Sequence, residues 1–133
     1  MVRHVTRRSG LLLAAGFLAT CAAARAQQPA QPARPFNAVG RWRFFHTDGT
    51  PFHVRLAPDH SAMSDFAAGE QGIWRWEGNA VRILFTDGWD DLLSKGPDGS
   101  FTHAGWAPQA DRCGPSSNRG RGEKLSDDPG PKL

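Results

Sequence analysis

Apolar and polar side chains alternate along several short segments of the chain. Residues 41–44 read Arg-Trp-Arg-Phe, residues 52–56 read Phe-His-Val-Arg-Leu, and Val81, Ile83 and Phe85 are two positions apart. Side chains of a strand point alternately to its two faces, so each apolar set defines one buried face. No window shows the i, i+3, i+4, i+7 apolar spacing of an amphipathic helix. The pattern therefore predicts strands throughout.

Turn sequences separate these segments at short intervals, including Asp-Gly pairs at 48–49, 87–88 and 98–99. Such spacing is typical of antiparallel strands joined by tight turns. We expect an all-β fold, a small antiparallel meander of seven or eight strands curled into a barrel or a strongly bent sheet. The expected strands are 40–46, 51–57, 61–66, 72–77, 80–86, 90–95 and 100–106. An eighth could come from residues 121–125.

Composition confines the packed domain to the middle of the chain. Twelve of the 13 Trp and Phe residues lie between residues 36 and 106, and the chain has no Tyr. We therefore expect a β-domain over 38–107 with a core of Trp and Phe. Residues 27–37 are rich in Pro and Gln and are expected to form a linker. Residues 108–133 are polar and are expected to form a flexible tail, because they offer little apolar surface to bury.

The first 26 residues have the order of a cleaved signal peptide. Basic residues at 3–8 precede an apolar run at 11–19, and Ala24-Arg25-Ala26 is a small-x-small cleavage site. Residues 6–12 resemble the twin-arginine export motif, although Gly10 replaces a usually bulky residue; the general secretory route is the alternative. The apolar run is too short to span a bilayer. We expect a periplasmic or secreted protein.

Removing this segment changes the charge and the cysteine count. Of the 16 Lys and Arg residues, 12 remain from residue 27 onward, against 13 Asp and Glu. The mature chain is then nearly neutral, which argues against nucleic-acid binding. Cys113 would be its single cysteine. Leu18–Cys21 resembles a lipobox, but Thr20 fits it poorly, so discard of Cys21 with the signal peptide is preferred over membrane anchoring through a lipid.

A pattern of Gly, Trp and Asp resembles a group of small exported bacterial β-domains that has no settled function. It consists of Gly72-x-Trp74, followed by Asp87-Gly88-Trp89-Asp90. The resemblance spans residues 38–107 and implies a fold but no activity. Gly40-x-Trp42 adds a distant likeness to lipocalin barrels, whose first strand often opens in this way. With seven short strands rich in Trp and Phe, we expect a filled interior rather than a ligand cavity.

Candidate functional residues gather around one turn. Trp89 follows a glycine in a turn, where a buried Trp is less expected, so it is the first candidate for a binding contact; Trp106 is the second. Asp87, Asp90 and Asp91 surround Trp89, and either turn hydrogen bonds or a calcium loop would explain them, with turn hydrogen bonds preferred. Four scattered histidines form no metal motif. No catalytic residue, metal or cofactor is assigned.

These observations favour a non-catalytic binding module for a protein or cell-envelope partner. The alternative is a small lipocalin-like carrier or sensor of an apolar ligand. An enzyme is the least favoured class, because no familiar catalytic motif occurs in the sequence. Neither a nucleic-acid partner nor a transmembrane span is expected.

Overall fold

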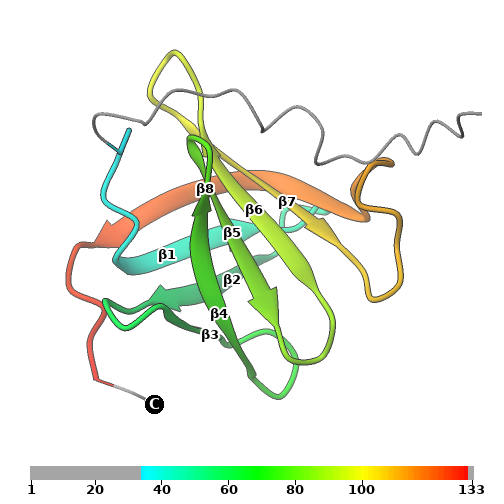
Figure 1. Cartoon of the computed structure of the whole chain (residues 1–133), viewed down its shortest axis with the longest axis horizontal. Helices are drawn as coiled ribbons and strands as arrows, with labels where there is room; N and C mark the ends of the chain where they lie inside the picture. Colours follow the sequence, from blue (N-terminus) through cyan, green and yellow to red (C-terminus); the bar gives the residue numbers. More distant parts are fainter. Residues whose placement is uncertain (1–33, 132–133) are drawn as a thin grey trace, which may run out of the picture.

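A computed structural model describes residues 34–131 as a closed barrel of eight antiparallel strands, each paired with its neighbours in sequence (Figure 1). The last strand pairs with the first. The strands are β1 (Gly40–Phe45), β2 (Pro51–Leu56), β3 (Ser61–Ser64), β4 (Glu70–Glu77), β5 (Ala80–Phe85), β6 (Asp90–Lys95), β7 (Phe101–Trp106) and β8 (Asn118–Ser126).

The expected all-β meander is confirmed, and seven of its strands lie where the alternation placed them. The largest differences flank the loop between β3 and β4. β3 ends at Ser64 because the Ser64 hydroxyl accepts a hydrogen bond from the backbone N–H of Phe66, 3.0 Å away, which turns the chain. β4 then begins at Glu70, two residues earlier than expected.

The eighth strand is longer than the alternative considered from the sequence, and it corrects the expectation of a flexible tail over 108–133. β8 pairs with β1 on one side and with β7 on the other. Its order comes from this pairing more than from apolar burial. Gly120 is required because a Cβ there would collide with the carbonyl oxygen of Phe45. On the outer face, the guanidinium of Arg121 lies 4.2 Å from the centre of the Phe45 ring.

The barrel interior is filled by the apolar residues that alternate along the strands. Two indole groups find hydrogen-bond acceptors there: Trp42 Nε1 donates to the carbonyl of Ala38 at 2.9 Å, and Trp74 Nε1 donates to that of Ala57 at 2.8 Å. The fully buried large side chains are Trp42, Phe44, Val54, Leu56, Val81, Ile83, Leu93 and His103. His103 is the only polar residue in this set, and its partners belong to the site described below.

One end of the barrel is closed by the segment that precedes β1. The ring of Phe36 makes edge-on contacts with Trp76 and Phe101, each with ring centres 5.0 Å apart, and with Trp42 at 5.9 Å. Lys124 Nζ donates to the carbonyl of Val39 at 2.7 Å and so ties this segment to β8. We call this aromatic cluster of Phe36, Trp42, Trp76 and Phe101 the closed end.

Several expectations concern residues that the structure leaves undescribed. The signal peptide, most of the linker and Cys21 lie outside residues 34–131. Within this range no cysteine is free, so the single thiol expected at Cys113 is not observed. Nor does the described part of the chain form any helix long and apolar enough to cross a membrane.

Candidate functional site

The opposite end of the barrel holds an open pocket of about 560 Å³, which we call the mouth pocket. Four connections surround it: the β1–β2 and β5–β6 turns, the β3–β4 loop and the β7–β8 loop. The residues that line it are His46, Thr47, Asp48, Thr50, Phe52, Phe66, Glu70, Trp89, Asp91, Ser117 and Asn118. The expectation of a wholly filled interior is therefore wrong at this end, because the eighth strand widens the barrel enough to leave space at its mouth.

Aromatic rings form the apolar wall of the mouth pocket. The imidazole of His46 stacks on Phe52 with ring centres 4.6 Å apart, and Phe66 packs against both. Trp89, carried by the β5–β6 turn, meets Phe66 edge-on with ring centres 6.4 Å apart. Trp89 is half-buried, so it contributes one face to the protein and leaves surface for the pocket.

A hydrogen bond from Asn118 orients the His46 imidazole. Asn118 Oδ1 accepts from the backbone N–H of Thr47 at 2.9 Å, so the amide nitrogen of Asn118 must face His46. That nitrogen lies 2.7 Å from His46 Nδ1, which is therefore the acceptor. Nδ1 is thereby occupied, and Nε2 is the ring nitrogen left to bond other groups. Asn118 thus joins β8 to the β1–β2 turn at the rim of the pocket.

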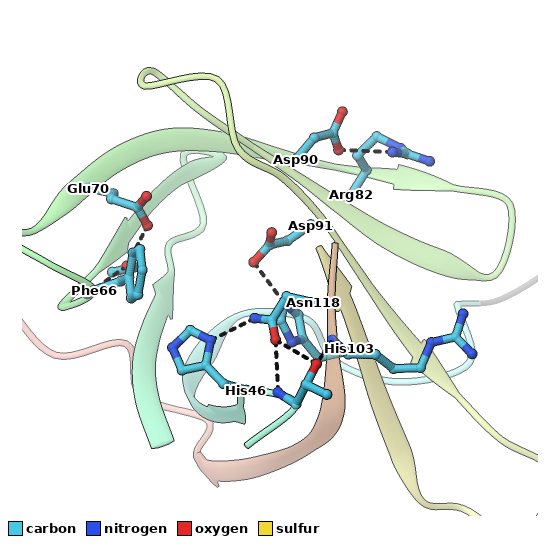
Figure 2. A network of polar contacts seen from close by, with 11 residues as sticks. His46, Phe66, Glu70, Arg82, Asp90, Asp91, His103 and Asn118 are labelled. Atoms are coloured by element: carbon cyan, nitrogen blue, oxygen red, sulfur yellow. Dashed lines mark hydrogen bonds and ion pairs between the residues drawn. The ribbon is translucent and has the colours of Figure 1, made fainter. Parts of the chain in front are cut away.

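Glu70 provides a buried carboxyl group in the same pocket (Figure 2). Only 9% of Glu70 is exposed. Its Oε2 accepts a hydrogen bond from the Ser64 hydroxyl at 2.9 Å, whereas Oε1 has no hydrogen-bond partner. Burial, followed by the neighbouring carboxyl groups of Asp87 and Asp91, raises the pKa of Glu70 to about 7, although the hydrogen bond from Ser64 acts to lower it.

Asp91 projects inward from β6 and binds a buried histidine. Asp91 Oδ2 lies 2.9 Å from Nε2 of His103, and the two residues are 4% and 1% exposed. The His103 ring stacks on Phe44 with ring centres 4.7 Å apart, beneath the mouth pocket. His103 Nδ1 has no hydrogen-bond partner. The pocket floor therefore carries a polar pair set into an apolar core.

The charged residues that line the mouth pocket have one sign. Among residues 34–131, Asp48, Glu70 and Asp91 line it, and no Lys or Arg does. Low-dielectric walls strengthen the field of such groups, so the pocket attracts positive charge and repels negative charge.

The structure divides the five residues singled out from the sequence between two sides of the barrel wall. Trp89 and Asp91 line the mouth pocket. Asp87 lies at its rim, where its carboxylate accepts a hydrogen bond from the backbone N–H of Trp89 at 3.2 Å. The Asp87 carboxyl group also raises the pKa of Glu70. Asp90 and Trp106 lie on the outer face.

On that outer face the two residues have structural partners. Asp90 Oδ1 accepts from Arg82 Nη1 at 2.9 Å, and Asp90 also pairs with Arg112. Arg112 in turn covers the ring of Trp106, whose Nε1 donates to the carbonyl of Gly114 at 3.1 Å. Figure 2 shows Asp90 and Asp91 on opposite sides of β6. In this arrangement Asp90 and Asp91 do not converge on one ion (Figure 2).

Sequence reasoning missed His46, Glu70, His103 and Asn118. Two of them carried a signal: His46 is in phase with Trp42 and Phe44, and Glu70 is in phase with Trp74, which places both on the inner face at a strand end. The convergence of these residues depends on barrel closure, which pairs strands far apart in sequence.

A search for metal sites and comparisons with known proteins give no further information about the site. Among residues 34–131, no group of three or more His, Cys, Asp or Glu side chains is arranged to hold a metal ion. Comparison with family models, curated proteins and solved structures finds no match to this chain. The functional argument therefore depends on the geometry of the mouth pocket.

Proposed function

We propose that this protein is a binding domain that receives a small, partly apolar molecule in the mouth pocket. The observation that carries the proposal is a pocket that combines aromatic rings with a buried carboxyl oxygen for which residues 34–131 offer no hydrogen-bond partner. Ligand sites combine mostly apolar linings with a few placed polar groups in this way. This is the carrier or sensor alternative of the sequence analysis, and it now takes precedence over a macromolecular partner.

The size of the pocket supports a ligand of modest dimensions. Small-molecule sites usually enclose about 300–1,000 Å³, and the mouth pocket, at about 560 Å³, lies within that range. An eight-stranded barrel is wide enough to hold one small ligand in this manner. Because Phe36 and its neighbours fill the closed end, the ligand would enter and leave through the mouth.

The rings and the carboxyl group of the pocket would have separate roles. Phe52, Phe66 and Trp89 offer ring faces that would bury the apolar part of the ligand. Glu70 would orient it through a polar contact, since a buried oxygen without a hydrogen bond gains most from a new donor. Binding would thus depend on both the shape and the polarity of the ligand.

We also propose that the domain acts after export, in the periplasm or outside the cell. The support is the order of basic, apolar and small residues within positions 1–26. The nearly neutral charge of residues 27–133, with 12 Lys and Arg against 13 Asp and Glu, is consistent with a small-molecule role rather than a nucleic-acid role.

The test is the binding of N-phenyl-1-naphthylamine, a neutral apolar dye that becomes fluorescent in apolar pockets. The blocking variant is Thr50→Trp, because Thr50 is exposed and lines the mouth pocket. Its matched control is Thr102→Trp, which places the same side chain on the exposed outer face of β7.

We expect saturable dye binding by the natural chain and by Thr50→Trp at least tenfold weaker binding. Thr102→Trp should bind the dye as the natural chain does. Equal binding by all three proteins would place the dye elsewhere and overturn the proposal. No dye binding by the natural chain would overturn it as well.

A further inference from the structure

We propose that the ligand of the mouth pocket carries a protonated amine beside its apolar part, and that Glu70 receives this amine. The inference rests on the proposed function and specifies its substrate class. It starts from the charge of the lining, in which the described part of the chain places three carboxyl groups and no Lys or Arg. An anionic ligand would meet uncompensated repulsion there, whereas a cation would be attracted.

Among the acidic residues of the pocket, Glu70 has a fully buried oxygen that lacks a hydrogen-bond partner within the described residues. Asp48 already accepts from the backbone N–H of Thr50 at 2.9 Å, and Asp91 is engaged by His103 at 2.9 Å. Glu70 Oε2 accepts from Ser64, which leaves Oε1 buried and without a donor. An ammonium group has three donors and would satisfy Oε1 with a charge-assisted hydrogen bond.

The aromatic wall suits the same ligand. Trp89, Phe66 and Phe52 line the same pocket, and Phe66 lies beside Glu70, since the Ser64 hydroxyl bonds both residues (Figure 2). Ring faces attract cations, and the attraction grows when the cation is removed from water. His46 Nδ1 is occupied by the Asn118 amide 2.7 Å away and so does not compete for Glu70. An amine attached to an apolar body would therefore contact complementary groups in the same pocket.

The protonation of Glu70 makes such binding dependent on pH. Burial and the neighbouring carboxyl groups of Asp87 and Asp91 together raise the pKa of Glu70 to about 7. The other titratable groups around the pocket are Asp48, Asp87, Asp91 and His46. A bound ammonium favours the ionised carboxylate, so binding would release the Glu70 proton below pH 7. Affinity for an amine should therefore fall by about tenfold between pH 8 and pH 6.

The experiment compares three probes of similar shape by calorimetry on the full mature chain. They are 2-phenylethylamine as the cation, 2-phenylethanol as the neutral analogue and 3-phenylpropionate as the anion. The test variant is Glu70→Gln, which keeps the shape and the acceptor for Ser64 but removes the charge. The matched control is Glu123→Gln, the same change on the outer face of β8, where Glu123 pairs with Arg43 at 3.4 Å.

We expect the amine to bind at least tenfold more tightly than the alcohol, and the carboxylate not to bind. Glu70→Gln should lose at least tenfold in affinity for the amine and little for the alcohol, and its amine affinity should no longer change between pH 6 and pH 8. Glu123→Gln should behave as the natural chain.

The failures of the two proposals are distinguishable. If the apolar dye binds at the mouth but the amine does not, or if the alcohol or the carboxylate binds as tightly as the amine, the amine inference is wrong and the pocket remains a binding site. An unchanged amine affinity in Glu70→Gln would also overturn the inference. If neither the dye nor any of the three probes binds, the proposed function itself fails.

Discussion

Each end of the barrel carries a cluster of four rings, and the two clusters differ in what lies among them. At the closed end, Phe36 inserts between Trp76 and Phe101 with ring centres 5.0 Å away on both sides. At the open end, Phe66 and Trp89 are 6.4 Å apart, and the buried carboxyl group of Glu70 and the imidazole of His46 lie with them. The closed end is built to exclude solvent. The open end keeps polar groups buried with fewer partners than they can use, which costs stability and is typical of a binding site.

The strongest test of this contrast is Phe36→Ala at the closed end. We expect it to lower the free energy of unfolding by about 2–3 kcal/mol, because it removes a partly buried ring that contacts three others. Urea denaturation followed by tryptophan fluorescence would measure the loss. If the free energy of unfolding changes by less than about 0.5 kcal/mol, the level of an ordinary surface substitution, then the packing of Phe36 does not stabilise this end of the barrel.

Glu70→Gln tests whether the buried carboxylate at the open end lowers the free energy of unfolding. The pKa of Glu70 is about 7 in the folded state and near 4.5 when unperturbed. Between these pH values the folded chain holds a proton that the unfolded chain has lost, so the natural chain should lose stability as the pH rises from 4.5 through 7. Glu70→Gln should remove that loss and be more stable at pH 8 by on the order of 2 kcal/mol.

The measurement is urea denaturation of both chains at pH 5 and pH 8. The two proteins should have nearly equal stability at pH 5, where Glu70 is neutral in the folded state. A variant that is less stable than the natural chain at pH 8 would show that the ionised carboxylate stabilises the fold, contrary to this comparison.

Phe66→Ala repeats the closed-end substitution at the open end. Phe66 lies on a loop and faces the pocket, so we expect a loss of only about 1 kcal/mol in the free energy of unfolding. Dye affinity, in contrast, should fall severalfold because one ring of the wall is gone. Equal destabilisation by the two Phe→Ala changes, under the same denaturation protocol, would erase the distinction between the two ends.

The smallest effect is expected for Asp65→Asn, next to Phe66. Asp65 Oδ1 accepts from the backbone N–H of His53 at 2.6 Å, and Oδ2 lies 2.8 Å from its imidazole. Although burial acts to raise the pKa of Asp65, the hydrogen bonds from His53 outweigh it and lower the pKa below 3.8. Its contribution is thus present above that value and is lost as the pH falls through the lower folded-state pKa.

Both side chains of this pair are half exposed, and Asn keeps the acceptor for the backbone N–H. We therefore expect a loss of about 0.5 kcal/mol at pH 7. The difference between the two chains should vanish at pH 2, as measured by urea midpoints. A loss that persists unchanged at pH 2 would show that the carboxylate charge is not its source.

The strands could be predicted from the sequence wherever apolar and polar residues alternate in step with burial. β1, β2 and β5 alternate cleanly and were predicted within one residue, and β6 was predicted with its observed bounds. β8 lacked this signal, because its inward positions include Gly120 and Gly122 and its order comes from pairing on both sides. Trp89 was found because an aromatic in a turn is unusual. Glu70 and His103 were not, since each acquires its role from residues on other strands.

The pairing of β8 with β1 has a consequence for how the chain reaches this fold. The Arg43–Glu123 contact that spans this seam joins residues 80 positions apart, and contacts of such separation slow folding. Until β8 docks, β1 and β7 are both open edges that another chain could pair with. Asn118, which orients His46 at the pocket rim, is the first residue of β8. Ring closure and the acquisition of a complete pocket are therefore one kinetic event, and we expect a chain that ends before residue 118 to have neither.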